Sequence, residues 1–198
     1  MAWRTEKWSA EVFPGLDKIY SEYAHLPRRE LAVIAAAVLD AALSEVLSKR
    51  FVDHAAEIED FLGLDGDGRA PCAAFGAKIQ IGLLTGVLTP TDAGVLRAIK
   101  GIRNRFAHEV KADFTSKSVL PFVLSLHEQF GARGRAILDA HLWPQQKQHL
   151  AAMLPHLKTA PEAGAGLLLA VLCVYQVYFY RLLDKTQRVY ARPWNKKT

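Results

Sequence analysis

Apolar residues recur at intervals of three and four along most of the chain, and no run alternates in the manner of a β-strand. This pattern predicts an all-α fold, a single-domain bundle of about seven or eight helices. The expected helices cover residues 11–25, 27–51, 53–62, 73–88, 90–108, 116–130, 144–157 and 162–190. Gly131 and Gly134 are expected to loosen the chain after the sixth helix.

Two of these helices carry most of the information. Between residues 31 and 47 the polar positions are Asp40, Ser44 and Glu45, so this helix is expected at the centre of the bundle, contacted all round. Asp40 falls on its apolar side and should point inward. Because a buried carboxylate is costly without a partner, Asp40 should have a cation or another donor beside it.

The helix over residues 90–108 has a clear start. Thr89 is the expected cap, Pro90 occupies the first helical position and Asp92 follows three residues after the cap. The residues expected to form its buried face are Val95, Ile99, Ile102, Phe106 and Val110.

Polar residues near the end of that helix divide between two sides. Asn104 and His108 lie on the face opposite the buried one, whereas Arg103 lies at the border of the apolar stripe. We therefore hypothesise an Arg103–Asp40 ion pair that joins the two helices. Arg103 and His108 are about 140° apart on an ideal helix. They can act together only if the helix ends near Ala107 or a second subunit supplies its own copy.

The last expected helix is strongly apolar. From residue 163 to residue 180, Gln176 is the one polar side chain apart from the tyrosines, and eighteen apolar residues reach the lower limit for a membrane span. The aromatic residues in its second half favour a buried or dimerising helix over a membrane span. No second candidate span is expected.

Composition adds a location and a basic tail. The length of 198 residues suits one domain over residues 1–198, and the start does not resemble a signal peptide. Two cysteines without a pairing pattern favour the cytoplasm. From residue 181 onward there are six basic residues and one acid, which accounts for the whole net charge of +5. This end, with a basic tail at residues 191–198, is expected to be a solvated terminus; nucleic acid or anionic lipid is the alternative partner.

Metal and cofactor motifs are not expected. Asp65 and Asp67 suggest a calcium loop, but its twelfth position would be Gly76 instead of a glutamate, so a tight turn is favoured. The histidines lack ligand spacing, and no phosphate-binding glycine loop is present. We therefore expect no metal and no cofactor.

Residues 26–126 resemble the mannitol operon repressor family of bacterial regulators. The resemblance rests on RRELAVIAAAVLDAALSEVL, on FLGLDGDGRAPCAAFGAKIQIGLLTGVLT, and on IRNRFAHE with the following DFTSKSVL. It implies a helical, cytoplasmic and dimeric protein that works through protein contacts. The chain has no helix-turn-helix pattern or other motif for reading a DNA sequence. Residues 127–190 are expected to form additional helices outside the resemblance.

The segment RNRFAH is also similar to the R-x4-6-H motif of HEPN domains, helical modules found in many prokaryotic toxins and defence proteins. This resemblance implies that the bundle is HEPN-like. In catalytic members this motif cuts RNA without a metal, and two copies meet across a dimer. By that resemblance Arg103 binds the scissile phosphate, His108 acts as general acid or base, and Asn104 orients one of them. Asp40 and Arg105 are expected as supporting residues.

Two functions therefore stay open. The first is a regulator that acts through a protein partner or through homodimerisation, and it is slightly favoured because the longer resemblance is to regulators. The second is a metal-independent ribonuclease or RNA-binding protein that uses Arg103 and His108 across a dimer. A structural role for both residues, inside the fold, is the alternative to a catalytic one.

Overall fold

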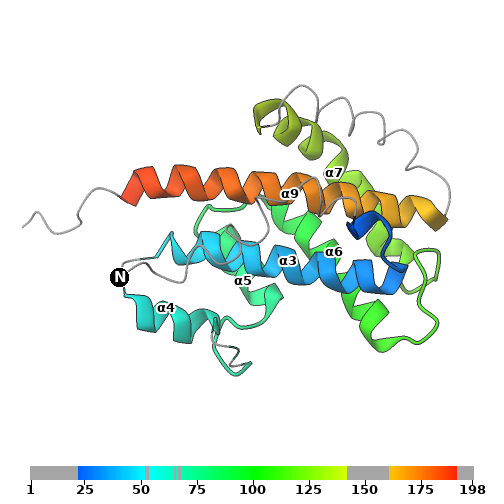
Figure 1. Cartoon of the computed structure of the whole chain (residues 1–198), viewed down its shortest axis with the longest axis horizontal. Helices are drawn as coiled ribbons and strands as arrows, with labels where there is room; N and C mark the ends of the chain where they lie inside the picture. The colour runs from blue at the N-terminus through cyan, green and yellow to red at the C-terminus, as the bar shows by residue number, and fades with distance from the viewer. Residues whose placement is uncertain (1–21, 52–53, 65, 67, 142–160, 191–198) are drawn as a thin grey trace, which may run out of the picture.

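A computed structural model of the chain describes residues 22–51, 54–64, 66, 68–141 and 161–190, and these residues form an all-α bundle (Figure 1). The predicted all-α bundle is confirmed. The principal helices are α3 (Arg28–Ser48), α4 (Ala55–Leu62), α5 (Phe75–Leu84), α6 (Pro90–His108), α7 (Leu120–His141) and α9 (Pro161–Tyr190). The helix expected at residues 144–157, the basic tail at 191–198 and most of the helix expected at 11–25 lie outside the described residues, as do Asp65 and Asp67.

The core forms around α3 and α9, which lie side by side along the long axis of the molecule (Figure 1). Helix α6 packs against both α3 and α7, and α5 packs against α6. From Leu167 to Phe179 every residue of α9 is buried. This part of the helix is apolar on all sides, and other parts of the protein pack against each side.

Helix α3 departs from the expectation that it is contacted all round. Leu39, Leu43 and Leu47 have no exposed surface. Val33 is exposed, and so are the alanines at positions 37 and 41, which lie one and two turns later. One side of α3 therefore faces solvent. An apolar helix made largely of alanine tolerates this because each alanine leaves little apolar surface in water.

Within the described part of the chain, two helices are long and apolar enough to cross a membrane: Arg28–Ser48 and Gly164–Leu183. The sequence pattern singles out only the second, so the expectation of a single candidate is wrong. In the most apolar stretch of each helix, 67% and 78% of the residues, respectively, are buried inside the protein. The core helices of soluble proteins can have the same length and composition as membrane spans, so this finding is weak evidence for a membrane.

Two helix boundaries differ from the prediction. Helix α5 ends at Leu84 because Gly86 adopts a positive φ of 71° and the Leu88 N–H donates back to the Gly82 carbonyl. Helix α7 continues through Gly131 and Gly134 as far as His141, so the expected loosening is wrong. A Cβ at position 134 would lie 2.7 Å from the Phe130 ring, so the glycine there leaves room for that ring.

Candidate functional site

The R-x4-H motif lies at the end of α6, a helix that starts as predicted. The Thr89 hydroxyl accepts a hydrogen bond from the Asp92 N–H at 3.1 Å, and the Asp92 carboxylate accepts one from the Thr89 N–H at 3.0 Å. This reciprocal capping box satisfies two N–H groups that have no partner inside the helix. Pro90 occupies the first turn, where no N–H is required.

One face of α6 forms part of the core. Val95, Ile99, Ile102 and Phe106 are between 0% and 1% exposed, as the helical periodicity predicts. Val110 was expected on the same face, but it is 90% exposed because the helix ends at His108. The buried stripe therefore stops one turn earlier than predicted.

The C-terminal end of α6 is bound by Arg29 from the first turn of α3. Its guanidinium donates to the carbonyl oxygens of Phe106 at 2.5 Å, Glu109 at 2.8 Å and Val110 at 2.6 Å. The last carbonyls of a helix lack partners within it and carry partial negative charge, so a cation there satisfies both needs. This contact was not anticipated from the sequence, because nothing in the pattern places residue 29 beside residue 109.

The neighbouring Arg28 fixes the segment that follows α6. It forms a salt bridge with Asp113 at 2.6 Å, and Asp113 also accepts a hydrogen bond from the Thr115 N–H. Together the two arginines at the start of α3 hold the last turn of α6 and its exit loop in one position.

Arg103 and His108 are both exposed, and they lie on different sides of α6. Both are inside the regular helix, so no helix end separates them. The Arg103 guanidinium donates to the Asn104 side-chain oxygen at 3.0 Å, and Asn104 is half-buried. The structure thus brings Arg103 and Asn104 together, whereas it does not bring either of them to His108 through any hydrogen bond among the described residues.

Arg105 supports the helix end without joining the other motif residues. Its guanidinium pairs with Glu109 at 3.0 Å, and the Ser118 hydroxyl donates to the same carboxylate at 2.5 Å. The hydrogen bond from Ser118, followed by the contact with Arg105, lowers the pKa of Glu109. The Glu109 carboxylate, which Arg105 and Ser118 both contact, therefore ties the end of α6 to the segment before α7.

Asp40 has a cationic partner as predicted, but the partner is Lys78 on α5. The two charged groups are 3.0 Å apart, and the Lys78 side chain is 7% exposed. The hypothesised Arg103–Asp40 ion pair is wrong: among the described residues the carboxylate pairs with the Lys78 ammonium group from α5 instead. Burial raises the pKa of Asp40, and the charges of Lys78 and Arg103 partly oppose that rise.

The most buried charge of the described residues is Asp92, at the other end of α6. Beyond its capping role, its carboxylate accepts two hydrogen bonds from Arg133 on α7, at 2.7 and 2.9 Å, and one from Tyr175 on α9, at 2.9 Å. The Tyr178 hydroxyl is a weaker donor at 3.4 Å, and the Arg133 guanidinium lies 5.0 Å above the Tyr178 ring. Sequence reasoning identified the cap but missed this network.

The network sets the ionisation of its members. Burial alone would raise the pKa of Asp92, but the donors from Arg133, Thr89 and Tyr175 outweigh it and lower that pKa. Burial, followed by the nearby Asp92 charge, raises the pKa of Tyr178 to about 12. The carboxylate therefore stays ionised while the tyrosine keeps its proton, and the interaction joins α6, α7 and α9.

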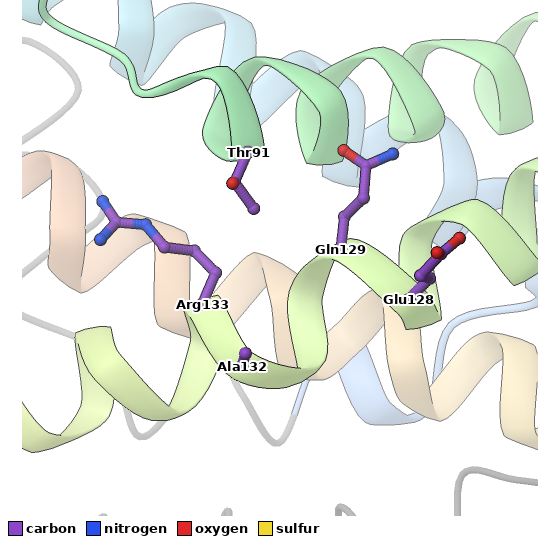
Figure 2. Close-up of a pocket in the computed structure, with 5 residues that line it drawn as sticks. All are labelled: Thr91, Glu128, Gln129, Ala132 and Arg133. Carbon is purple, nitrogen blue, oxygen red and sulfur yellow. The ribbon is translucent and has the colours of Figure 1, made fainter.

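A shallow pocket of about 620 Å³ opens beside this network (Figure 2). Thr91 comes from the first turn of α6, and Glu128, Gln129, Ala132 and Arg133 come from α7 (Figure 2). Arg133 is engaged by Asp92, and the Gln129 amide donates to a serine one turn earlier. The pocket is separate from the R-x4-H motif, which occupies the opposite end of α6.

Metal-ligand geometry is not found in the part of the chain that the structure describes: no group of three or more His, Cys, Asp or Glu side chains could hold an ion there. Cys72 and Cys173 are both buried free thiols. Burial raises the pKa of Cys173 to about 12, so this thiol is not a reactive nucleophile.

Comparison with known proteins does not assign the chain to a family. No protein-family model matches the sequence, and no curated protein and no solved structure matches it either. The resemblances to mannitol operon repressors and to HEPN domains therefore stay predictions.

Proposed function

We propose that the chain acts on RNA through Arg103, Asn104 and His108, with the motifs of two copies meeting in a dimer. The observation that carries this proposal is the exposure of Arg103 and His108. Lys78 neutralises Asp40 in place of Arg103, so the Arg103 guanidinium has no structural ion pair to maintain. A guanidinium with N–H donors facing solvent is suited to a phosphate group.

The proposed chemistry is transesterification at a phosphodiester. The RNA 2′-hydroxyl attacks phosphorus, the bond to the 5′ oxygen breaks, and the products are a 2′,3′-cyclic phosphate and a 5′-hydroxyl. Arg103 binds the phosphate and stabilises the charge that develops on it. The His108 side chain of the partner protomer takes the proton from the 2′-hydroxyl as general base, and the leaving 5′ oxygen takes up a proton from solvent.

The helix geometry supports a site that two copies of the chain share. Arg103 and His108 lie on different sides of one rigid helix, and Arg29 holds the last turn in place. A site assembled across a two-fold axis removes this restriction, because Arg103 of one protomer meets His108 of its partner.

The first test is degradation of total RNA in EDTA by the wild type, Arg103→Ala and His108→Ala. Both variants should lose activity by about a hundredfold or more, since each removes a group that acts in the transition state. Arg135→Ala and His127→Ala are matched controls, because both residues are exposed on α7. RNA that stays intact with the folded wild type would overturn the proposal.

Mixing the two inactive variants tests the shared site. A dimer of one Arg103→Ala chain and one His108→Ala chain keeps one complete site if each site takes its residues from both protomers. Random exchange should then restore about a quarter of the wild-type activity, since about half of the dimers are mixed and each has one working site. No recovery, despite verified exchange, would place Arg and His of each site in the same chain.

The second candidate function is regulation through protein contact, as the resemblance to mannitol operon repressors implies. The observation that favours it is apolar exposure near the motif: Val110 is 90% exposed, and Leu120 and Leu124, one turn apart on α7, are 39% and 61% exposed. Leu124→Ser should weaken self-association in sedimentation equilibrium. If association is lost while RNA is untouched by the wild type, the regulatory function is supported over the nuclease.

A further inference from the structure

The exposed side of α6 carries positive charge well beyond the motif. Between residues 93 and 108 the sequence has no acid and four cations: Arg97, Lys100, Arg103 and Arg105. Arg105 is neutralised by Glu109. The other three form no ion pair with a carboxylate among the described residues.

Most of these groups lie on one face of the helix. Arg97, Lys100, Asn104 and His108 are spaced by three, four and four residues, which places them on that face. Arg103 follows Lys100 by three residues and lies about 60° further round the helix. We call these five residues the basic track. Its ends, Arg97 and His108, are exposed, and they are about 16 Å apart along the helix axis.

Lys100 brings the track to a second source of positive potential. Helix α5 begins after Ala74 without a side-chain cap, so N–H groups of its first turn are not satisfied by a capping side chain. A Cβ at Gly76 would lie 2.5 Å from the Lys100 ammonium nitrogen, so the end of the Lys100 side chain lies against this turn. An ammonium group beside the positive end of a helix is unfavourable unless an anion joins them.

The carboxylates on neighbouring elements are paired with other cations or lie away from the track. Asp40 on α3 is near enough for the Arg103 charge to oppose the rise in its pKa, but its ion pair is with Lys78. Helix α5 contains no acidic residue. Glu109 and Asp113, which follow α6, are paired with Arg105 and Arg28. On α7, Glu128 lies beside Thr91, at the opposite end of α6 from the motif. The basic track is therefore available to a polyanion.

We propose that the basic track binds consecutive backbone phosphates of single-stranded RNA and leads the strand to Arg103 and His108. This inference rests on the proposed RNA function and adds Arg97 and Lys100 as substrate-binding residues outside the motif. A linear polyanion matches Arg97, Lys100 and Arg103, three cations that follow one another at intervals of three residues on a rigid helix. No aromatic side chain belongs to the track, so binding depends on phosphates and tolerates any base sequence.

The test uses a fluorescent 2′-O-methyl RNA, which binds without being cleaved because its nucleophilic hydroxyl is blocked. Dissociation constants of the full chain are measured by anisotropy over a series of salt concentrations. The double variant Arg97→Gln/Lys100→Gln is compared with Lys49→Gln/Arg135→Gln, which removes the same charge from other elements. Two lost single-strand phosphate contacts should lower the slope of log affinity against log salt by about 1.4 and weaken binding by about tenfold. Circular dichroism verifies that both variants fold.

Each outcome decides between the two proposals. Weaker binding and a smaller slope for Arg97→Gln/Lys100→Gln alone supports the basic track. Equal binding by the two double variants overturns the track while the proposed RNA function stands. A wild type that binds no RNA overturns both. Binding to phosphatidylserine vesicles at least as tight as to RNA, with the same loss in the track variant, would assign the surface to a membrane instead.

Discussion

At the N-terminal end of α6, the Asp92 carboxylate is fully buried and receives hydrogen bonds from the preceding cap and from two other helices. At the C-terminal end, Arg103 and His108 are exposed, and Arg29 contacts only the backbone carbonyls. The same helix thus has one end where every charge is used inside the fold and one where charged side chains face solvent. Polar groups of the first kind stabilise the protein, and those of the second kind are available to a ligand.

The largest expected effect is at Asp92. Asp92→Asn keeps the size of the side chain but removes the negative charge that Arg133 pairs with, and that arginine is 24% exposed. Removing one partner of a buried ion pair should lower the free energy of unfolding by about 3 kcal/mol or more. Urea denaturation measures this value. Asp60→Asn, at an exposed position on α4, is the control and should change stability by less than about 0.5 kcal/mol.

The acid limb of the stability curve tests the same carboxylate. The pKa of Asp92 is lower in the folded protein than its ordinary value, so its contribution is complete above the ordinary pKa and is lost as pH falls through the lowered one. Wild-type stability should therefore decrease below about pH 4 more steeply than that of Asp92→Asn. The two curves should converge at low pH. A constant difference down to acid pH would show that the ionised carboxylate is not the stabilising group.

The sequence predicts the features that depend on residues within one helix. It does not predict the contacts that a second helix provides. Thr89, Pro90 and Asp92 identify the start of α6 because a capping box is local. The partners of Asp92 come from residues 41 and 83 positions later, which no local pattern contains. The same reason explains why the partner of Asp40 was predicted wrongly. Its burial predicts a nearby cation, but the helical period cannot show whether that cation is Lys78 on α5 or Arg103 on α6.

The motif shows the same division between local and tertiary information. The helical period predicts the sides of α6 on which Arg103 and His108 lie. The apolar stripe alone does not predict whether these two side chains are exposed. Arg97 and Lys100 were visible as cations on the polar face, without an acid nearby. What the sequence does not contain is the position of α5, which brings its uncapped first turn to Lys100.

A smaller effect is expected at the opposite end of α6. Arg29→Met keeps an apolar stem but removes the guanidinium from three carbonyls, two of whose hydrogen bonds are exposed to solvent. Because water can replace exposed hydrogen bonds, the loss of stability should be only about 1 kcal/mol. Hydrogen exchange of the Glu109 amide, which closes the last turn, should accelerate. Arg135→Met, an exposed change on α7, should leave that amide unaffected.

The smallest stability effect is expected for the residues most important to the proposed function. Arg103→Ala and His108→Ala remove exposed side chains, and the hydrogen bond that Arg103 donates to Asn104 stays within α6. Each should change the free energy of unfolding by less than about 0.5 kcal/mol, as surface substitutions do. The same proteins should nevertheless lose RNA cleavage. A cost of about 2 kcal/mol or more at either position would instead indicate a structural role. The contrast with Asp92→Asn would then disappear, because both ends of α6 would serve the fold.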